Sequence, residues 1–594
     1  MSLETLNDIF FAVADRNERV VMMHRHAIQW VSISAGEFYR NVVGVACTLK
    51  QWGIGKGDRV AVLSENRPEW AIADFASLLI GAVVVPIYTT LTDEQVAYIL
   101  RDSGARVVFA SSEKQLAKVN NVRSQTSVEK SVVMDAVETA HAFHMQRLMH
   151  DGPQERSPQF DSAARSTAPQ DLATIIYTSG TTGVPKGAML THRNIASNIN
   201  GWLPAFDFHS AHISLSFLPL SHVTARNVDL GLLYRGATLA YVPFIDQLPK
   251  ALQEVRPTIF VGVPRVYEKI HGQVDQRTKS FPARQIYGWA KSVGRDHREE
   301  ITSGRTPTFF TWQLANRLVY SKVRAGMGGR VEVFISGGAP LGRELAAWYA
   351  DMGIRVHEGY GLTETSPVIA VNTPTAHKLG TVGKPLPNVE VRIAEDGEIL
   401  VRGPSVFQGY WNKPQESEHA FSDGWFKTGD IGEIDAEGYL SVTDRKKDLI
   451  KTSGGKFIAP QPLENSLKHN ALVAEAVVLG DKRKFPAVLI APYFPLLEDW
   501  ARANHVVFAS RQELVALSKV RELYEGIVSE LNRDLARFEQ LKRVVLIADE
   551  FSAENGALTA SMKLRRRVVE ERYREQIEAM YGDAELASSV ERNG

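Results

Sequence analysis

Short runs of β-branched and other apolar residues recur along the N-terminal part of the chain, and segments with helical spacing separate them. The runs span residues 59–63, 106–110, 131–134, 174–178, 238–242, 258–261 and 331–335. Such alternation is typical of parallel sheets layered with helices. Because 594 residues exceed what one compact core accommodates, several structural units are expected. The pattern predicts layered α/β subdomains.

The texture changes near residue 397. Short alternating runs with Asp-Gly or Glu-Gly turns follow at 397–403, 409–411, 423–435 and 437–460, and they predict antiparallel strands in a small β-barrel-like part. Past about Lys447 we predict a smaller α+β unit with a strand pair at 474–479 and 487–493 and a helix at 564–580. The predicted fold class is α/β and α+β, with a large N-terminal domain, residues 1–446, and a small mobile C-terminal domain, residues 447–594.

The charge of the chain is balanced, with 68 Lys and Arg against 68 Asp and Glu. No global field therefore indicates nucleic acid or an anionic membrane as the primary partner. Between residues 265 and 324 the chain is rich in basic residues and spaced aromatics. We interpret this stretch as solvated helices over the core rather than as a nucleic-acid face.

Several features bear on the location of the protein. The single cysteine, Cys47, excludes an intramolecular disulfide and fits a reducing compartment. The N-terminus resembles no secretory signal. The charge-free stretch 75–92 is interrupted by Gly81 and Pro86 and falls short of the roughly 20 apolar residues of a spanning helix. We expect a cytoplasmic protein, and leave open peripheral contact with the inner face of the membrane and the choice between monomer and homodimer.

A polar, proline-punctuated stretch at 151–170, predicted to be an exposed connection, leads to the sequence YTSGTTGVPKG at 177–187. Its glycines permit close backbone approach, its N–H groups and hydroxyls can donate to phosphoryl oxygens, and Lys186 adds a positive charge. It is not a Walker A loop, because a proline precedes the lysine and a glycine follows it. A polar surface turn is the alternative. Further parts of a nucleotide site decide between them.

Five such parts follow along the chain. They are VEVFISGGAPL at 331–341, EGYGLTET at 358–365, WFKTGD at 425–430, DRKKDLIKTSGGK at 444–456 and GALTASMKLRR at 556–566. A Gly-Gly turn after a strand lets a flat ring lie on exposed backbone. Glu364 suits magnesium, which prefers a few carboxylate oxygens together with phosphate oxygens. Asp430 suits a ribose diol. Each part alone also fits a surface turn, a core residue or a helix start.

These motifs, in this order, resemble the adenylate-forming superfamily of acyl-CoA synthetases, luciferases and nonribosomal peptide adenylation domains. The resemblance runs from about Leu6 to about Lys563. Within the superfamily, FLPLSH at 217–222, VGVPRVYEKI at 261–270, the helical insertion that follows and the ending LTASMKLRR resemble bacterial long-chain acyl-CoA synthetases. The resemblance implies ATP, Mg²⁺ and coenzyme A as cofactors and cosubstrates, and a fatty acid as the partner substrate.

The resemblance also implies roles for individual residues. The β- and γ-phosphates of ATP would be bound by Thr178, Ser179, Gly180, Thr181, Thr182, Gly183 and Lys186. Adenine would be bound by Gly337, Gly338, Ala339, Pro340 and Tyr360, with Gly361 in the same nucleotide site. The α-phosphate would contact Thr363, the ribose Asp430 and Arg445, and magnesium Glu364 and Thr181. A catalytic part is implied for Lys186, His222 beside the acyl carboxylate, Thr363, Glu364 and Lys563.

In such enzymes a small domain rotates between two half-reactions. Lys447 matches the hinge, and Lys451, Gly454 and Gly455 match the segment that faces the active site during thioester formation. One departure is visible: many relatives have Gly-Lys at the catalytic lysine, whereas here the pair is Met562-Lys563.

Three other functions compete with a coenzyme A ligase. A fatty acyl-AMP ligase carries an extra insertion in the large domain, and none is obvious between Val371 and Arg402. A scaffold that has lost its chemistry would lack Lys563, Glu364 or Asp430, and all three are present. A lipid-surface module would bind vesicles without turning over ATP.

Overall fold

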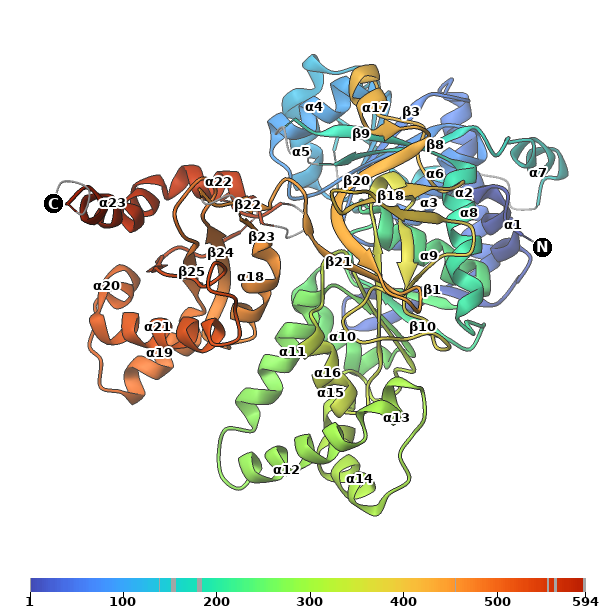
Figure 1. Ribbon diagram of the computed structural model, residues 1–594. Coiled ribbons are helices and arrows are strands. Elements are labelled where there is room, and N and C mark those ends of the chain that lie inside the picture. Colours follow the sequence, from blue (N-terminus) through green and yellow to red (C-terminus); the bar gives the residue numbers. More distant parts are fainter. Residues whose placement is uncertain are drawn as a thin grey trace. The chain divides into compact units, whose positions relative to one another are not determined.

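A computed structural model (Figure 1) describes residues 2–137, 139–150, 156–178, 184–453, 456–552, 555–559 and 564–590. Its contacts divide the chain into two compact units. The large unit comprises Met1–Arg392, Leu400–Thr428 and Ile434–Ser441, and the small unit comprises Ile393–Ile399, Gly429–Glu433 and Val442–Gly594. The boundary between residues 446 and 447 stays a prediction.

The first sheet of the large unit has the strand order β7-β6-β5-β3-β4-β8-β9 and is parallel except for the β8–β9 hairpin. Its strands are β3 (Arg59–Leu63), β4 (Val83–Ile87), β5 (Val107–Ala110), β6 (Lys130–Val133), β7 (Phe143–His144), β8 (Leu172–Thr178) and β9 (Lys186–Thr191). The helices along this stretch are α2 (Ala35–Gln51), α3 (Pro68–Leu79), α4 (Asp93–Ser103), α5 (Glu113–Val122) and α6 (Met145–His150). Every residue of β4 and β5 is buried, as expected of parallel strands covered on both faces.

The second sheet has the order β16-β15-β14-β13-β12-β10-β11-β1-β2. Its strands are β1 (Val20–His26), β2 (Gln29–Ser34), β10 (Ile213–Ser216), β11 (Thr238–Tyr241), β12 (Ile259–Gly262), β13 (Val333–Gly337), β14 (Val356–Gly361), β15 (Val368–Val371) and β16 (Lys384–Pro385). Its accompanying helices are α1 (Leu6–Ala14), α8 (His192–Trp202), α9 (Val223–Arg235), α10 (Leu248–Val255) and α16 (Arg343–Asp351). The two layers confirm the predicted α/β organisation.

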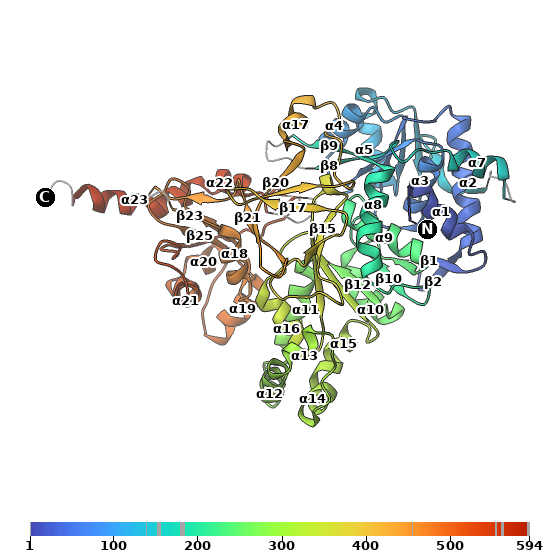
Figure 2. The ribbon, with the colours of Figure 1, turned by 45° about the vertical axis from the view of Figure 1, so that its right-hand side comes forward.

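Between β12 and β13 the chain forms a helical insertion. It contains α11 (Pro264–Arg277), α12 (Ala283–Asp296), α13 (Arg298–Thr302), α14 (Phe310–Ala315), a π-helical turn (Asn316–Tyr320) and α15 (Ser321–Gly326). Figures 1 and 2 both show α12 and α14 projecting beyond the sheets of the large unit.

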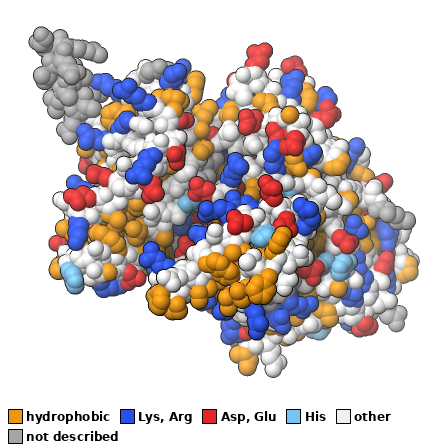
Figure 3. All heavy atoms as spheres, turned by 60° about the horizontal axis from the view of Figure 1, so that its bottom comes forward, with side chains coloured by type: hydrophobic (Ala, Val, Ile, Leu, Met, Phe, Trp, Pro, Cys, Tyr) orange, Lys and Arg blue, Asp and Glu red, His pale blue; other side chains and the backbone are white. Residues whose placement is uncertain are grey.

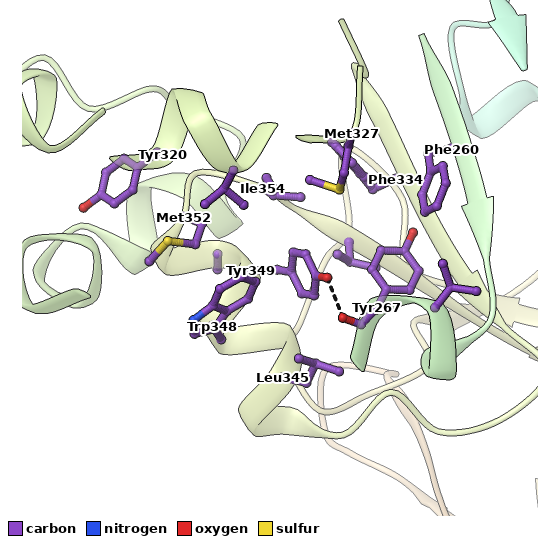
Figure 4. Packing of buried hydrophobic residues seen from close by; sticks show 14 of the residues in the cluster. Phe260, Tyr267, Tyr320, Met327, Phe334, Leu345, Trp348, Tyr349, Met352 and Ile354 are labelled. Carbon is purple, nitrogen blue, oxygen red and sulfur yellow. Dashed lines mark hydrogen bonds between the residues drawn. The ribbon is translucent and has the colours of Figure 1, made fainter. Parts of the chain in front are cut away.

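An aromatic core anchors this insertion to the second sheet (Figure 4). The Tyr349 hydroxyl donates to the backbone carbonyl of Tyr267 at 2.8 Å, and the Tyr320 hydroxyl donates to the carbonyl of Ala290 at 2.6 Å. Because these buried hydroxyls have partners, their burial carries no cost of an unmade hydrogen bond. The insertion is therefore packed as part of the large unit.

The predicted small β part is a sheet of order β17-β18-β20-β19, with β21 beside β20. Its strands are β17 (Glu390–Ile393), β18 (Glu398–Arg402), β19 (Phe421–Ser422), β20 (Trp425–Ile434) and β21 (Leu440–Arg445), and α17 (Pro414–His419) precedes β19. Segments of β18, β20 and β21 belong to the small unit.

The small unit is α+β, as predicted. Its main sheet pairs β24 (Val473–Leu479) with β25 (Ala487–Pro492) antiparallel and β25 with β26 (Val544–Leu546) parallel, while β22 (Ile450–Lys451) pairs with β23 (Phe457–Ile458). Its helices are α18 (Pro460–Lys468), α19 (Phe494–Ala503), α20 (Arg511–Ala516), α21 (Ser518–Asn532), α22 (Arg566–Arg572) and α23 (Arg574–Val590). Hydrophobic clusters on the two faces of this sheet form its core.

The connection at 151–170, predicted to be exposed, contains a helix that its aperiodic sequence did not indicate, because Pro158–Arg165 forms α7. The Ser157 hydroxyl accepts the Phe160 N–H and a proline occupies the first turn, which together favour a helix start. Only Ala164 of this helix is buried. The helix therefore lacks the apolar stripe by which a sequence indicates a helix.

The single helix predicted at 564–580 is instead two helices, α22 and α23, with a break at Tyr573. The ring of Tyr573 is buried and its hydroxyl donates to Asp549 at 2.7 Å. Tertiary packing of this side chain accompanies the break, which the helical periodicity did not indicate.

Candidate active site

The predicted phosphate loop joins the two strands of the β8–β9 hairpin. Thr178 pairs with Lys186 across the hairpin, so the loop leaves and re-enters the sheet at these residues. Five predicted ligands of phosphate or magnesium lie outside the described residues: Ser179, Gly180, Thr181, Thr182 and Gly183. The structure thus locates both ends of the loop, Thr178 and Lys186.

Strand β9 packs closely at Gly187 and has a second segment of the chain beside it. A Cβ at this position would lie 2.6 Å from the Cγ2 atom of Ile175, which no side chain could tolerate without movement. Residues 409–411 run beside β9, where the Trp411 N–H donates to the Gly187 carbonyl at 2.7 Å and the Met189 N–H donates to the Gly409 carbonyl at 3.1 Å. This approach brings Tyr410 next to the lysine of the loop.

Tyr410 joins two of the predicted catalytic residues. The Lys186 ammonium lies 5.4 Å from the centroid of the Tyr410 ring, and the Tyr410 hydroxyl donates to Oε1 of Glu364 at 2.8 Å. A cation over an aromatic face is held electrostatically, while a phenol donor fixes the rotamer of the carboxylate. The structure therefore groups Lys186, Tyr410 and Glu364. The sequence analysis predicts only a strand at 409–411 and gives Tyr410 no role. The one signal for Tyr410 in the sequence is an aromatic residue with a hydroxyl group directly after a glycine.

Glu364 is held in a rigid turn. It belongs to the 3-10 turn Thr363–Thr365 and is 9% exposed. The hydroxyl of Thr365 donates to the Pro367 carbonyl at 2.5 Å, and the Phe407 N–H donates to the Glu364 carbonyl at 2.8 Å. At Gly361 a Cβ would lie 1.8 Å from the carbonyl oxygen of Pro367, so glycine is required there. This close packing positions Thr363 and Glu364 together.

The predicted adenine residues lie at one edge of the second sheet. Gly337 ends β13 and pairs with Gly359 of β14, so Gly338, Ala339 and Pro340 emerge beside Tyr360 and Gly361. Gly338 has φ +85°, a conformation that favours glycine. In open α/β sheets, ligands bind outside the carboxyl ends of parallel strands. The Gly-Gly motif after β13 and the Tyr360 motif of β14, which lie some twenty residues apart in the sequence, thus meet at the carboxyl ends of these two strands.

Glu358 adds a buried acid beneath this edge. It accepts the Leu341 N–H at 3.3 Å, and desolvation by burial raises its pKa to about 7. The same two strands carry the backbone of the adenine motif. The sequence reasoning gave Glu358 no role.

His222 caps helix α9. Its Nδ1 atom accepts the Thr224 N–H at 3.2 Å, and its side chain is half-buried. The preceding loop is fixed by Asn66, whose Oδ1 accepts the Leu220 N–H at 3.1 Å and whose amide donates to the Leu218 carbonyl at 2.7 Å. The imidazole is therefore held by both the cap and the loop.

The small unit contains the predicted ribose pair. Nε of Arg445 lies 3.0 Å from Oδ1 of Asp430, with the Asp430 side chain 6% exposed and that of Arg445 44% exposed. Lys451 lies on β22 with its ammonium 5.3 Å from the Phe457 ring centroid. Three predicted residues, Gly454, Gly455 and Lys563, lie outside the described residues.

The residues present fit a magnesium ion held largely by substrate. No group of three or more His, Cys, Asp or Glu that could hold a metal occurs in the described part of the chain. Glu364 supplies one fixed carboxylate, and Mg²⁺ commonly takes one or two carboxylates together with phosphate oxygens and water.

None of the described helices combines the length and apolar character that a membrane span requires.

Comparison with known proteins places these motifs in a family. The family described as "AMP-binding enzyme" matches residues 10–411, and the one described as "AMP-binding enzyme C-terminal domain" matches residues 447–585. Long-chain-fatty-acid–CoA ligase FadD15 of Mycobacterium bovis is 38% identical over 560 residues, covering 93% of this chain and 92% of that protein. Long-chain-fatty-acid–CoA ligase ACSBG2 of Xenopus laevis is 30% identical, covering 98% and 84%.

The fold agrees with this relationship. The adenylation domain of a carboxylate reductase from Mycobacterium chelonae superposes with a TM-score of 0.76 at 23% identity, covering 97% of this chain and 91% of that one. The predicted fold class and the resemblance drawn from the motifs are both confirmed. The chain belongs to the AMP-binding enzymes, the adenylate-forming superfamily.

Proposed function

We propose that the protein is an AMP-forming long-chain-fatty-acid–CoA ligase. It activates a long-chain fatty acid with ATP to acyl-AMP and pyrophosphate, and then transfers the acyl group to coenzyme A. Relatives of nearly full length carry this activity in their names, and ATP, Mg²⁺ and coenzyme A follow from it. The grouping of Lys186, Tyr410 and Glu364 is the structural observation that supports the proposal most directly.

The first half-reaction must bring two anions together. A carboxylate is a poor acyl donor, so its oxygen attacks the α-phosphorus of ATP and pyrophosphate leaves, which makes AMP the leaving group of the second step. Lys186 neutralises charge on the departing pyrophosphate, and Thr363 contacts the α-phosphate. Magnesium, when bound at Glu364, would spread charge across the phosphate oxygens. Positioning and charge neutralisation supply most of the rate in such transfers.

The remaining residues bind and orient the substrates. Gly337 to Pro340 and Tyr360 hold adenine against exposed backbone, Asp430 and Arg445 hold the ribose, and His222 orients the acyl carboxylate. Lys563 bridges the carboxylate and the α-phosphate. These roles rest on the match of each residue to the family motif.

The second half-reaction needs different neighbours at the same carbon. The coenzyme A thiol attacks the acyl carbon and AMP leaves, so a lysine that served the first step must withdraw. Rotation of the C-terminal domain, residues 447–594, at Lys447 accomplishes this exchange. Lys451, Gly454 and Gly455 then face the thioester-forming site.

The reaction takes place in the cytoplasm. Peripheral contact with the inner face of the membrane belongs to the same proposal, because long-chain fatty acids partition into lipid.

One assay tests the proposed function. The protein is incubated with ATP, Mg²⁺ and coenzyme A, and thioester formation is measured across fatty acids of increasing length. Consumption of free coenzyme A that rises towards long chains supports the ligase. Accumulation of acyl-AMP with coenzyme A untouched would identify a fatty acyl-AMP ligase instead, and absence of ATP turnover would indicate a scaffold or lipid-binding module.

A further inference from the structure

The projecting end of the helical insertion exposes a set of large apolar side chains. We name this set the apolar tip; it consists of Phe281, Ile286, Trp289, Phe310, Leu314 and Leu318. Phe281 and Phe310 are 78% and 79% exposed. Figure 3, which brings the lower end of Figure 1 forward, shows hydrophobic side chains gathered on this face with Lys and Arg beside them. A contiguous exposed patch of this kind marks an interaction surface.

The apolar tip is the second hydrophobic face of helices that already pack on the core. Helix α12 buries Tyr287, Ala290 and Val293 and leaves Ile286 and Trp289 outside. The Trp348 indole donates to the Tyr287 hydroxyl at 2.8 Å, which fixes the inward face. Rotation of α12 to bury its outer face would break this contact.

Helix α14 and the π-helical turn repeat this arrangement. They bury Trp312, Ala315 and Val319, whereas Phe310, Leu314 and Leu318 follow one another four residues apart on the outer side. Residues spaced by four lie on one helix face. The two helices contact each other, so their outer faces form one surface.

The same segment is strongly basic although the whole chain is neutral. Residues 277–324 contain ten Lys or Arg and three Asp or Glu. Arg277, Lys279, Arg284 and Arg317 are exposed, and none has a carboxylate partner within salt-bridge distance in the part of the chain that the structure describes. The apolar tip is therefore bordered by uncompensated positive charge.

We propose that the apolar tip docks on an anionic lipid bilayer. Amphipathic helices with aromatic and aliphatic residues on one side and Lys or Arg beside them bind at the boundary of headgroups and acyl chains. Anionic lipid attracts the basic border. This surface lies outside the proposed active site. The inference rests on the peripheral membrane contact of the proposed function and names the surface and the kind of lipid that would make it.

Charge and side-chain chemistry distinguish this occupant from two others. A second copy of the chain, docked through the same patch on both subunits, would place each basic border opposite its own counterpart and be repelled. Nucleic acid would satisfy the basic residues but leave Ile286, Leu314 and Leu318 without a partner, since bases stack on aromatic rings. A bilayer accommodates both the apolar side chains and the basic residues.

Vesicle flotation of the full chain, without ATP or coenzyme A, tests the proposal. The wild-type protein is expected to float with vesicles of phosphatidylcholine and phosphatidylglycerol, and much less with phosphatidylcholine alone or at high salt. Phe310→Ser with Leu314→Ser should lower partitioning by about tenfold or more. Lys279→Gln, Arg284→Gln and Arg317→Gln should each lower it about fivefold, on anionic vesicles only.

Matched controls make the result specific. Ile28→Ser removes an equally exposed side chain, 79% accessible, outside the insertion, and should leave flotation unchanged. Thermal denaturation checks that every variant folds. Trp289→Phe should remove part of the fluorescence blue shift that the wild type shows on binding, because Trp289 enters the interface.

Three results would overturn the proposal. One is flotation that the apolar and basic variants leave unchanged. Another is a homodimer, measured by light scattering, that the Phe310→Ser and Leu314→Ser pair dissociates. A third is tight binding of single-stranded DNA without binding of anionic vesicles. None depends on thioester formation, so failure here and failure of the proposed reaction are distinguishable.

Discussion

The phenol of Tyr410 donates a hydrogen bond to the carboxylate of Glu364 at 2.8 Å, while the ring of Tyr410 faces the Lys186 ammonium. One side chain thus orients the proposed magnesium ligand and contacts the proposed pyrophosphate ligand. We regard Tyr410 as a positioning residue, because groups that orient a metal ligand govern its function nearly as strongly as the ligand itself.

Tyr410→Phe should lower the rate of acyl-AMP formation by roughly 10- to 100-fold and raise the Mg²⁺ concentration needed for half-maximal rate. The ring and its contact with Lys186 remain, so only the orientation of Glu364 is lost. ATP–pyrophosphate exchange across a magnesium titration measures both effects. Tyr39→Phe, which removes a hydroxyl bound to Asp161 at 2.8 Å, is the matched control. An unchanged magnesium dependence in Tyr410→Phe would reduce this residue to a packing role.

Lys563→Ala should abolish acyl-AMP formation and leave thioester formation from supplied acyl-AMP largely intact. The reason is that its positive charge is needed only while two anions approach each other. Single-turnover assays of the two half-reactions test this separation. Equal loss of both would remove the proposed role of Lys563.

Lys447→Pro should spare ATP–pyrophosphate exchange and suppress release of the thioester. Proline fixes φ near −65° and thereby restricts rotation at this residue. Lys447→Ala removes the same charge without the restriction and should retain both half-reactions. If the proline variant completes the whole reaction at the normal rate, the hinge lies elsewhere.

His222 has two separable functions, the cap of α9 and the proposed contact with the acyl carboxylate. His222→Asn should preserve the cap, since Asn is a favoured N-cap residue, whereas His222→Ala should lose about 1 kcal/mol of stability. Both should raise the KM for the fatty acid. Thermal denaturation and steady-state kinetics distinguish these effects; a KM change in the alanine variant alone would leave only the cap.

Glu358→Gln should increase stability at alkaline pH. Burial raises the pKa of Glu358 in the native protein to about 7, from 4.5 for the ordinary side chain. The stability that the protonated side chain contributes is therefore complete below the unfolded pKa, and it is lost as the pH rises through 7. Between these two pKa values the native state keeps a proton that the unfolded state releases. The free energy of unfolding therefore falls with rising pH, by at most roughly 3 kcal/mol in total.

The measurement is the Tm of both proteins between about pH 5 and about pH 8. The advantage of Glu358→Gln should grow across this interval, because the amide cannot ionise and still accepts the Leu341 N–H. Glu94→Gln, at an exposed position of α4, should show no such trend. A constant difference across the interval would mean that Glu358 is not protonated in the native protein.

The family, the fold class and most strands could be predicted from short-range patterns. Runs such as 59–63 and 106–110 became β3 and β5 because β-branched residues buried on both faces favour parallel strands. The motif at 358–365 is predicted to belong to a nucleotide site only through its place in the order of the other motifs, because alone it also fits a surface turn or a core residue. Helix α7 was not predicted, because its start depends on a cap and a proline rather than on apolar spacing.

Contacts between distant segments were decided by packing. Tyr410 reaches Glu364 only because residues 409–411 lie along β9, where their backbone is hydrogen-bonded to Gly187 and Met189. In the same way, apolar residues occur all round α12 and α14, and periodicity cannot say which of two hydrophobic faces meets the core. The tertiary structure buries Tyr287 and Trp312 and leaves Trp289 and Phe310 in solvent, because the hydrophobic core that includes α16 offers a partner to one face of each helix only.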